Sequence, residues 1–368
     1  MPDGNTAEYY RKHADSILYA NGNLVLGIAA DKTVLQLSRD DFVDMAENAT
    51  DAVRFERDIL IKKDGTLISP APLVRSWDHI TALAGGSTGS YKKFYVGLKD
   101  DGTLISTGAN TCGQGDVSAW KNVTAISCGY RHTAALLENG RVLTTGSDKN
   151  GQCNTSDWED VAAVFAALDC TFALKKDGTV LSAGAARYGC DLSGWSDIEE
   201  LVVSEGTISA TWNGGVTLAG RKKDGTVLTT GFNTNPKHGA KRWDTESWEN
   251  IISVSSHGEQ LLGLRKDGTV AAVGPNEKGQ CNVSEWRDII GIYGGFGGVS
   301  AGIQSDGHVV YTAHSVVPGR VTYKITLSPP VISKKTLFTI KAFSMDKQMG
   351  KLACPDVWTL ENLTSMSK

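Results

Sequence analysis

This chain of 368 residues lacks long apolar runs, Cys-x-x-Cys pairs and a strong net charge. No apolar stretch approaches the 18 residues of a transmembrane helix, and the segment Met1–Lys12 holds no apolar core of a signal peptide. The formal net charge of −4 gives no general attraction to nucleic acid or anionic lipid. These absences predict a cytoplasmic protein with neither a membrane nor a nucleic-acid partner.

Helical periodicity and catalytic motifs are scarce as well. Between residues 50 and 314 no sustained 3.6-residue apolar period with capping residues occurs, so we expect strands rather than helices. The histidines show no metal-ligand spacing such as His-x-x-x-His. Gly85–Gly89 has the letters of a nucleophile elbow, but that motif needs a strand followed by a helix. We therefore predict no catalytic residue, no metal and no cofactor.

What the chain does contain is a unit of about 38 residues that repeats along most of its length. One mark of the unit is a turn of Asp-Gly or Asn-Gly, with its glycine at Gly65, Gly102, Gly140, Gly178, Gly225, Gly268 and Gly307. The other mark is Trp-x-Asp/Asn-Ile/Val, which begins at Trp120, Trp158, Trp195, Trp248 and Trp286, and at Trp77 with His in the third place. A fixed period in this range predicts a repeat architecture.

Each unit has the pattern of three short strands. Asp-Gly or Asn-Gly between two apolar runs, as in Thr133–Thr145, is a strong hairpin signal because both central residues of such a turn need positive φ. A third run follows each tryptophan, for example Val123–Ser127. Together with a unit around Asp31–Thr33 that matches the pattern only weakly, the sequence contains eight hairpins. We expect an all-β protein that closes radially into a β-propeller, which explains why so many short strands need no aggregating edge.

The repeat resembles a known family. The segments His132–Gly146 and Asn150–Asn154, followed by Trp158, are similar to the regulator of chromosome condensation repeat in its shorter, bacterial form. The resemblance covers residues 50–314 and extends faintly back to residue 16. It implies a single propeller of seven blades, with the ring closed by the two ends of the repeat array. The count of eight hairpins leaves an eight-bladed ring as the alternative.

The repeat divides the chain into three parts. Residues 1–15 form an N-terminal extension, residues 16–314 form the propeller, and residues 315–368 form a C-terminal extension. We expect the last part to be irregular or partly disordered, with two strands at Val321–Leu327 and Thr336–Phe343 as its ordered candidates.

The seven cysteines are expected to be reduced structural thiols. Cys153, Cys190 and Cys281 stand at the same place in three different units. Equivalent positions on different blades should lie about 10 Å or more apart. A disulfide needs Cα atoms within about 7 Å. The sequence also holds no Cys-x-x-Cys pair, and the number of cysteines is odd.

Strand order sorts the loops into two faces. We define the bottom face by the Asp-Gly turns and the top face by the opposite strand ends, including the loops that join the first and second strands of each unit. Insertions occur only in top loops, at Ser87–Lys93, Glu205–Gly215 and Phe232–Asp244, whereas the bottom turns keep their length. Because loops on a rigid scaffold carry function, we predict the top face as the binding face.

The resemblance also indicates contact residues. A propeller-type β-lactamase inhibitor protein, to which this chain is similar, binds its target with aromatic residues in these same top loops. Carried over by position, the candidates are Tyr91, Phe94, Tyr130, Arg131, Trp212, His257 and Phe296. Tyr, Trp and Arg are the residue types that dominate interface energetics. We hypothesise a monomeric, non-enzymatic module that binds a partner protein.

Two other functions stay open. An enzyme with a site in the central funnel would be indicated by three or more acidic or histidine side chains that converge on the ring axis. A guanine-nucleotide exchange factor is the third hypothesis. In the larger family that activity is linked to a wedge-like insertion and a longer, Leu-Gly-rich repeat, and we recognise neither in this sequence.

Overall fold

The computed structural model describes residues 14–21, 24–29, 33–37, 52–56, 59–62, 64–68, 72–87, 92–184, 190–205, 215–231, 243–256, 260–277, 279–294, 300–305, 309–312, 323–326 and 358–359. For some strand residues, including all of those before residue 59, it describes only the path of the backbone.

The described residues form eight small antiparallel sheets that follow one another along the chain. Each sheet is built from three consecutive strands, and the eight triplets are β1 (Ala14–Asn21), β2 (Leu24–Ala29) and β3 (Thr33–Leu37); β4 (Ala52–Glu56), β5 (Ile59–Lys62) and β6 (Leu67–Ile68); β7 (Ile80–Ser87), β8 (Lys93–Lys99) and β9 (Leu104–Gly108); β10 (Val123–Cys128), β11 (His132–Leu137) and β12 (Val142–Gly146); β13 (Val161–Ala167), β14 (Cys170–Lys175) and β15 (Val180–Gly184); β16 (Ile198–Glu205), β17 (Val216–Lys222) and β18 (Val227–Gly231); β19 (Ile251–Ser255), β20 (Leu261–Arg265) and β21 (Val270–Val273); β22 (Ile289–Gly294), β23 (Ser300–Gln304) and β24 (Val309–Thr312). Among the described residues a 3-10 helix, η2 (Pro72–Val74), is the single helical element. The all-β prediction is confirmed.

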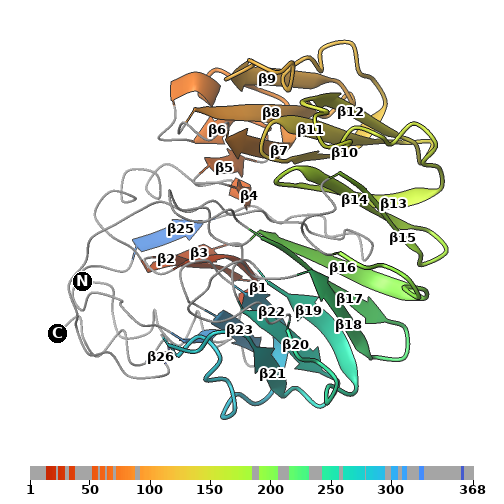
Figure 1. The fold of residues 1–368 in the computed structure, drawn as a ribbon. Helices are drawn as coiled ribbons and strands as arrows, with labels where there is room; N and C mark the ends of the chain where they lie inside the picture. The colour runs from red at the N-terminus through yellow and green to blue at the C-terminus, as the bar shows by residue number, and fades with distance from the viewer. Residues whose placement is uncertain are drawn as a thin grey trace.

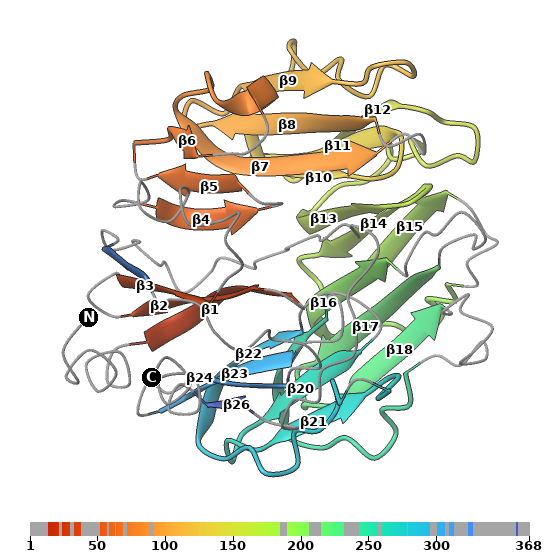
Figure 2. The same cartoon turned by 90° about the vertical axis from the view of Figure 1, so that its left-hand side faces the viewer.

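The sheets stand side by side around a common centre, as the blades of a propeller do (Figures 1 and 2). The first strand of each sheet contacts the first strand of the next, from β4 and β7 through to β19 and β22. Strand β1 contacts both β22 and β4, so the first sheet lies between the last sheet and the second. First strands are therefore the inner strands and third strands the outer ones. Eight sheets are described where the resemblance implied seven blades, and eight is the number of hairpins counted in the sequence.

Two short strands come from the segment 315–368. Strand β25 (Tyr323–Thr326) pairs antiparallel with β3, and β26 (Trp358–Thr359) pairs antiparallel with β24. Strand β25 lies inside the range Val321–Leu327 that was expected to be a strand, whereas Thr336–Phe343 lies outside the described residues. The C-terminal segment thus contributes fourth strands to the first and last sheets.

The bottom turns have a different geometry from the one predicted. After β8 the N–H of Gly102 donates to the Lys99 carbonyl oxygen (3.1 Å), while the N–H of Lys99 donates to the Thr103 carbonyl oxygen (2.9 Å). This is a three-residue loop in which a type I turn ends in a left-handed glycine. In all six described turns only the glycine has positive φ, at 75–86°. The expectation of two positive-φ residues is therefore wrong, whereas positive φ at Gly178 and Gly268 is confirmed.

The threonine that follows most turn glycines forms hydrogen bonds with the aspartate of the same turn. The Asp101 carboxylate accepts hydrogen bonds from the backbone N–H of Thr103 (2.9 Å) and from its hydroxyl (2.6 Å). The same pair of bonds forms at four other turns, which start from Asp64, Asp177, Asp224 and Asp267. The recurring Asp-Gly-Thr is therefore an Asx turn joined to a left-handed glycine.

The third residue of the tryptophan signature is also left-handed. These residues have φ of 56–59° and are His79, Asn122, Asp160, Asp197, Asn250 and Asp288. Asn, Asp and His are the non-glycine residues most enriched in this region, which explains the sequence pattern. The residue that follows donates its N–H to the turn glycine of the preceding sheet, for example Ile198 to the carbonyl oxygen of Gly178 (3.0 Å). The two sequence marks of the repeat therefore meet at the boundary between sheets.

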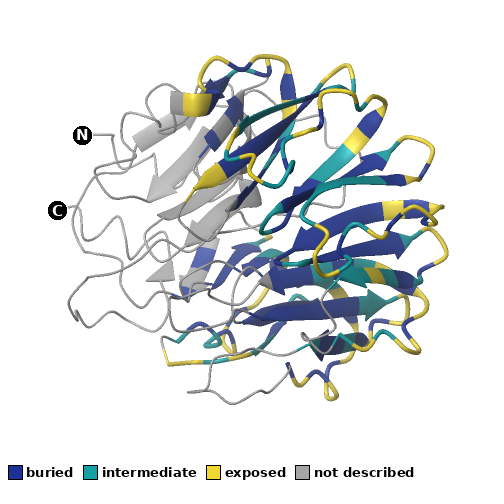
Figure 3. Ribbon diagram, turned by 45° about the horizontal axis from the view of Figure 1, so that its top comes forward, coloured by how far each residue is buried: buried dark blue, intermediate teal, exposed yellow. Residues whose placement is uncertain are grey.

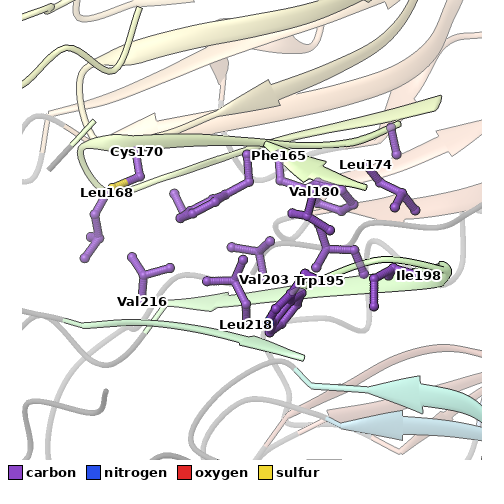
Figure 4. Packing of buried hydrophobic residues seen from close by; sticks show 14 residues of the cluster. Phe165, Leu168, Cys170, Leu174, Val180, Trp195, Ile198, Val203, Val216 and Leu218 are labelled. Carbon is purple, nitrogen blue, oxygen red and sulfur yellow. The ribbon is translucent and has the colours of Figure 1, made fainter. Parts of the chain in front are cut away.

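Apolar side chains fill the spaces between successive sheets, and exposed residues gather at the loops (Figure 3). Between β13–β15 and β16–β18, for example, Phe165 faces Trp195 and Leu218 (Figure 4). Five of the six signature tryptophans are buried, and the partly buried Trp120 packs against such a cluster. These tryptophans therefore form part of the core between sheets.

The tryptophan rings require a small residue on the middle strand. A Cβ atom on Gly263 would lie 2.6 Å from the Trp248 ring, and one on Gly220, Gly97 or Gly302 would lie 2.7, 2.9 or 3.0 Å from its own tryptophan. The equivalent residues opposite Trp120 and Trp158 are Ala135 and Ala173. A large side chain at these positions would displace the ring from the core.

Candidate functional site

The short top loop Gly129–Arg131, between β10 and β11, has a rigid backbone. The N–H of Gly129 donates to the carbonyl oxygen of His132 (2.9 Å), and the N–H of Tyr130 donates to the carbonyl oxygen of Leu168 in the next sheet (2.8 Å). The N–H of Ser147, just after β12, donates to the carbonyl oxygen of Arg131 (2.8 Å). Three bonds to three different segments therefore hold a loop of three residues.

Tyr130 and Arg131 form a stacked pair in this loop. The Arg131 Cζ lies 5.2 Å from the centroid of the Tyr130 ring, which is within the range of a cation–π interaction. Both side chains are partly exposed. The pair thus places an aromatic surface beside a guanidinium group on a loop whose backbone is held by hydrogen bonds.

His132 supports the loop from below. Its side chain is fully buried, and Nε2 lies 3.0 Å from the Thr171 hydroxyl oxygen in the next sheet. The Thr171 hydroxyl donates its only proton to the carbonyl oxygen of Gln152 (2.7 Å), so Nε2 of His132 must be the donor in the contact between them. This chain of bonds continues the connection between adjacent sheets beneath Tyr130.

Buried glutamines after the outer strands were not found by the sequence reasoning. Gln114, Gln152 and Gln280 have at most 4% of their surface exposed. The backbone carbonyl oxygen of each glutamine accepts a hydrogen bond of 2.7 Å from a hydroxyl group on the next sheet. The donors are Thr133, Thr171 and Ser300 respectively. The Gly-Gln pair at 113–114, 151–152 and 279–280 was the available signal, and it positions the top end of each boundary between sheets.

The structure separates the predicted contact residues. Tyr130 and Arg131 lie together on the top face, as described above. Phe94 has 1% of its surface exposed and belongs to the core between two sheets with Val96 and Val123, so its side chain cannot contact a partner. The other four candidates lie outside the described residues, and they are Tyr91, Trp212, His257 and Phe296. Most residues of the three insertions lie outside them too.

The inner strands carry one described ion-pair group. In β16, Glu200 accepts a hydrogen bond from Nε of Arg221 (3.1 Å) and another from the backbone N–H of Val254 in the next sheet (3.1 Å), while Glu199 pairs with Nη1 of Arg221 (3.1 Å). Burial raises the pKa of the Glu200 carboxyl, and the hydrogen bond and charge of Arg221 oppose that shift. These groups hold two sheets together.

The described cysteines are free thiols, as predicted. Burial raises the pKa of Cys190 to about 12 and that of Cys281 to about 11, so both thiols remain protonated at neutral pH. Within the described residues no group of three or more His, Cys, Asp or Glu side chains is placed to hold a metal ion. In the same part of the chain, no helix is long and apolar enough to span a bilayer.

Comparison with known proteins agrees with the repeat. Residues 123–152 match the model of the Regulator of chromosome condensation (RCC1) repeat. The fold, repeated small antiparallel sheets arranged as in a β-propeller, agrees with that match. The search of curated proteins found no match to this chain.

Three solved structures illustrate the likeness in fold. The CRINKLY WD40 ectodomain of the Arabidopsis thaliana receptor kinase ACR4 is 12% identical (TM-score 0.44), covering 82% of this chain and 95% of that one. The C-terminal domain of gp131 from bacteriophage phiKZ is 12% identical (TM-score 0.42), covering 88% and 100%. Prp20p from Saccharomyces cerevisiae is 14% identical (TM-score 0.34), covering 86% and 77%. With TM-scores this low, the account of the fold depends on the sheets described above.

Proposed function

We propose that this protein is a non-enzymatic interaction module whose top loops bind a partner protein, with Tyr130 and Arg131 at the contact. The observation that carries the proposal is the stacked aromatic and guanidinium pair on a loop that is held by three backbone hydrogen bonds. A loop whose backbone is held before binding loses little conformational entropy in the complex, which favours affinity. Tyr and Arg are also enriched among the residues that dominate binding energy.

The bottom face supports the same assignment by contrast. Five of its described turns are closed by the same backbone bond, and each of the six described turn glycines accepts a backbone hydrogen bond from the next sheet. In five of these six turns the Asp and Thr side chains bind each other. Features that repeat in this way serve the fold, so we assign them to stability and assign recognition to the loops that vary.

We further propose that the ring has eight blades. Eight sheets are described, and each contacts the sheet before it and the sheet after it, including the first and the last. We propose that the protein acts as a monomer in the cytoplasm. Tyr91, Trp212, His257 and Phe296 remain candidate contacts because their loops belong to the top face.

The experiment is capture of the partner followed by measurement of affinity. The wild-type protein and the variants Tyr130→Ala and Arg131→Ala would be immobilised and exposed to extract of the source organism. Proteins retained by the wild type alone would be purified and titrated by calorimetry. We expect each variant to bind at least about 10-fold more weakly, which corresponds to about 1.4 kcal/mol. Lys176→Ala, a bottom-turn change, is the control, and equal losses for control and variants would reject the proposal.

A further inference from the structure

Among the described residues no strand pairs with the outer edge of β15. The N–H of Lys175 donates to the carbonyl oxygen of Thr179 (2.8 Å), which fixes the register between β14 and β15. In an antiparallel pair the bonded residues alternate. The N–H and C=O groups of Val180, Ser182 and Gly184 therefore point away from β14. Within the described residues β15 is the last strand of its sheet, so these groups face outward.

This edge lacks the features that usually prevent strand addition. Exposed edges are commonly guarded by charged side chains, proline or a β-bulge. The sequence Val-Leu-Ser-Ala-Gly of β15 contains no charged residue and no proline, and its pairing with β14 is free of bulges. Ser182, at the middle of the strand, is exposed. The edge is therefore a template for a further strand.

The same edge is already occupied in the first sheet. Strand β25 pairs antiparallel with β3, with Tyr323 opposite Gln36 and Ile325 opposite Val34. The segment Thr33-Val34-Leu35-Gln36 of β3 corresponds to Thr179-Val180-Leu181-Ser182 of β15, since both follow the turn of their unit. An extended segment therefore fits this position of the repeat, in a known direction and register.

The equivalent edges of β9 and β12 are more restricted. The Ser106 hydroxyl donates to the carbonyl oxygen of Gly115 (2.7 Å), and the Thr144 hydroxyl donates to the carbonyl oxygen of Cys153 (3.0 Å). Each bond holds the following loop against the outer strand. Ser182, the equivalent residue of β15, is exposed, whereas Ser106 and Thr144 are half-buried, so β15 is the most accessible of these three outer strands.

We propose that the outer edge of β15 binds an extended segment of a partner protein by antiparallel strand addition. The segment would alternate polar and apolar side chains as β25 does, with one residue opposite Ser182 and another, two positions along, opposite Val180. Main-chain hydrogen bonds supply affinity in this mode of recognition, and side-chain pockets supply selectivity. This surface is separate from the top loops, so it is a second docking site.

The probe is a labelled synthetic peptide of residues 321–328, the segment that contains β25. Its binding to the full-length protein would be followed by fluorescence anisotropy, and hydrogen exchange would locate it. We expect saturable binding and slowed exchange at the amides of Ser182 and Gly184. Ser182→Pro removes one outward N–H and no ladder bond, as prolines on edge strands do, and should weaken binding at least about 10-fold. Ser182→Ala keeps the N–H and should bind as the wild type does.

Three results would overturn the proposal. The first is failure of the peptide to bind the wild-type protein. The second is equal binding by a folded Ser182→Pro variant. The third is protection confined to β3, which would mean that the peptide only replaces the chain's own β25. If Ser182→Pro does not fold, Ser182→Lys is the substitute, because a charged side chain on an edge disfavours strand addition. The top-loop variant Tyr130→Ala should bind the peptide normally.

Discussion

The carbonyl oxygen of Gly178 accepts a hydrogen bond of 3.0 Å from the backbone N–H of Ile198, across the boundary between two sheets. Gly178 belongs to the Asp-Gly mark of one unit, and Ile198 belongs to the tryptophan mark of the next. The equivalent bond forms at every one of the six described boundaries of this kind, at 2.9–3.1 Å. The period of the sequence is therefore the period of this contact.

The left-handed residue before Ile198 makes the contact sensitive to substitution. We expect replacement of the equivalent Asp160 by valine to destabilise the protein by about 1–3 kcal/mol, since a β-branched residue is strained at a φ of 56°. Asp160→Gly relieves that strain and should be close to neutral. Urea unfolding of both variants measures the difference, and equal midpoints would show that the left-handed backbone is not the constraint.

Gly178 should tolerate even alanine poorly. Its φ is 84°, and an added Cβ would lie 2.9 Å from the Cα of Asp197. Gly194 has a similar φ of 76° but nothing within 4 Å of that position, so it serves as the matched control. We expect Gly194→Ala to cost about 1–2 kcal/mol from strain alone and Gly178→Ala to cost more. An equal loss of stability in the two variants would mean that the next sheet shifts to accommodate the added Cβ atom without cost.

Trp158 is the best position to test the core between sheets. It is buried against Ala173 and Val164. We expect Trp158→Ala to destabilise the protein by about 3–5 kcal/mol, the usual cost of removing a large buried aromatic. Thermal unfolding of the purified variant gives the value. An unchanged melting midpoint would contradict the assignment of this tryptophan to the core.

The bottom turns predict loss of stability in acid. Hydrogen bonds from the following threonine lower the pKa of Asp101, Asp177 and Asp224. A carboxyl whose folded pKa is depressed stabilises the protein above its unfolded pKa, and this stability is lost as pH falls through the folded pKa. We expect the melting temperature to fall below about pH 4. Replacing Thr103, Thr179 and Thr226 together by valine should flatten that fall, and an unaltered pH profile would contradict this origin.

The sequence predicted the strands and the positions of the turns because these depend on local patterns that recur. It did not predict the left-handed third residue of the tryptophan signature, although Asp, Asn and His at one position were a readable signal. The turn was misread because Asp-Gly is compatible with both two-residue and three-residue loops. The number of sheets followed the hairpin count, whereas the resemblance implied one fewer.

Phe94 is a predicted contact residue that the structure buries, whereas Tyr130 is one that it leaves partly exposed. Phe94 pairs with Gly108 across β8 and β9, as His132 pairs with Gly146, so its position in the repeat is the buried start of the middle strand. The insertion before Phe94 concealed this register in the sequence. Tyr130 lies two residues before the equivalent buried position, inside the loop itself. Recognition depends on a partner, and nothing in the periodic pattern encodes one.

The most direct test of the central claim is the affinity of Tyr130→Ala for the captured partner, compared with that of Lys176→Ala. If the top loops form the binding face, Tyr130→Ala binds at least about 10-fold more weakly, with an unchanged melting temperature, and Lys176→Ala binds as the wild type does. If Lys176→Ala weakens binding and Tyr130→Ala does not, the partner binds the bottom face and the account is wrong.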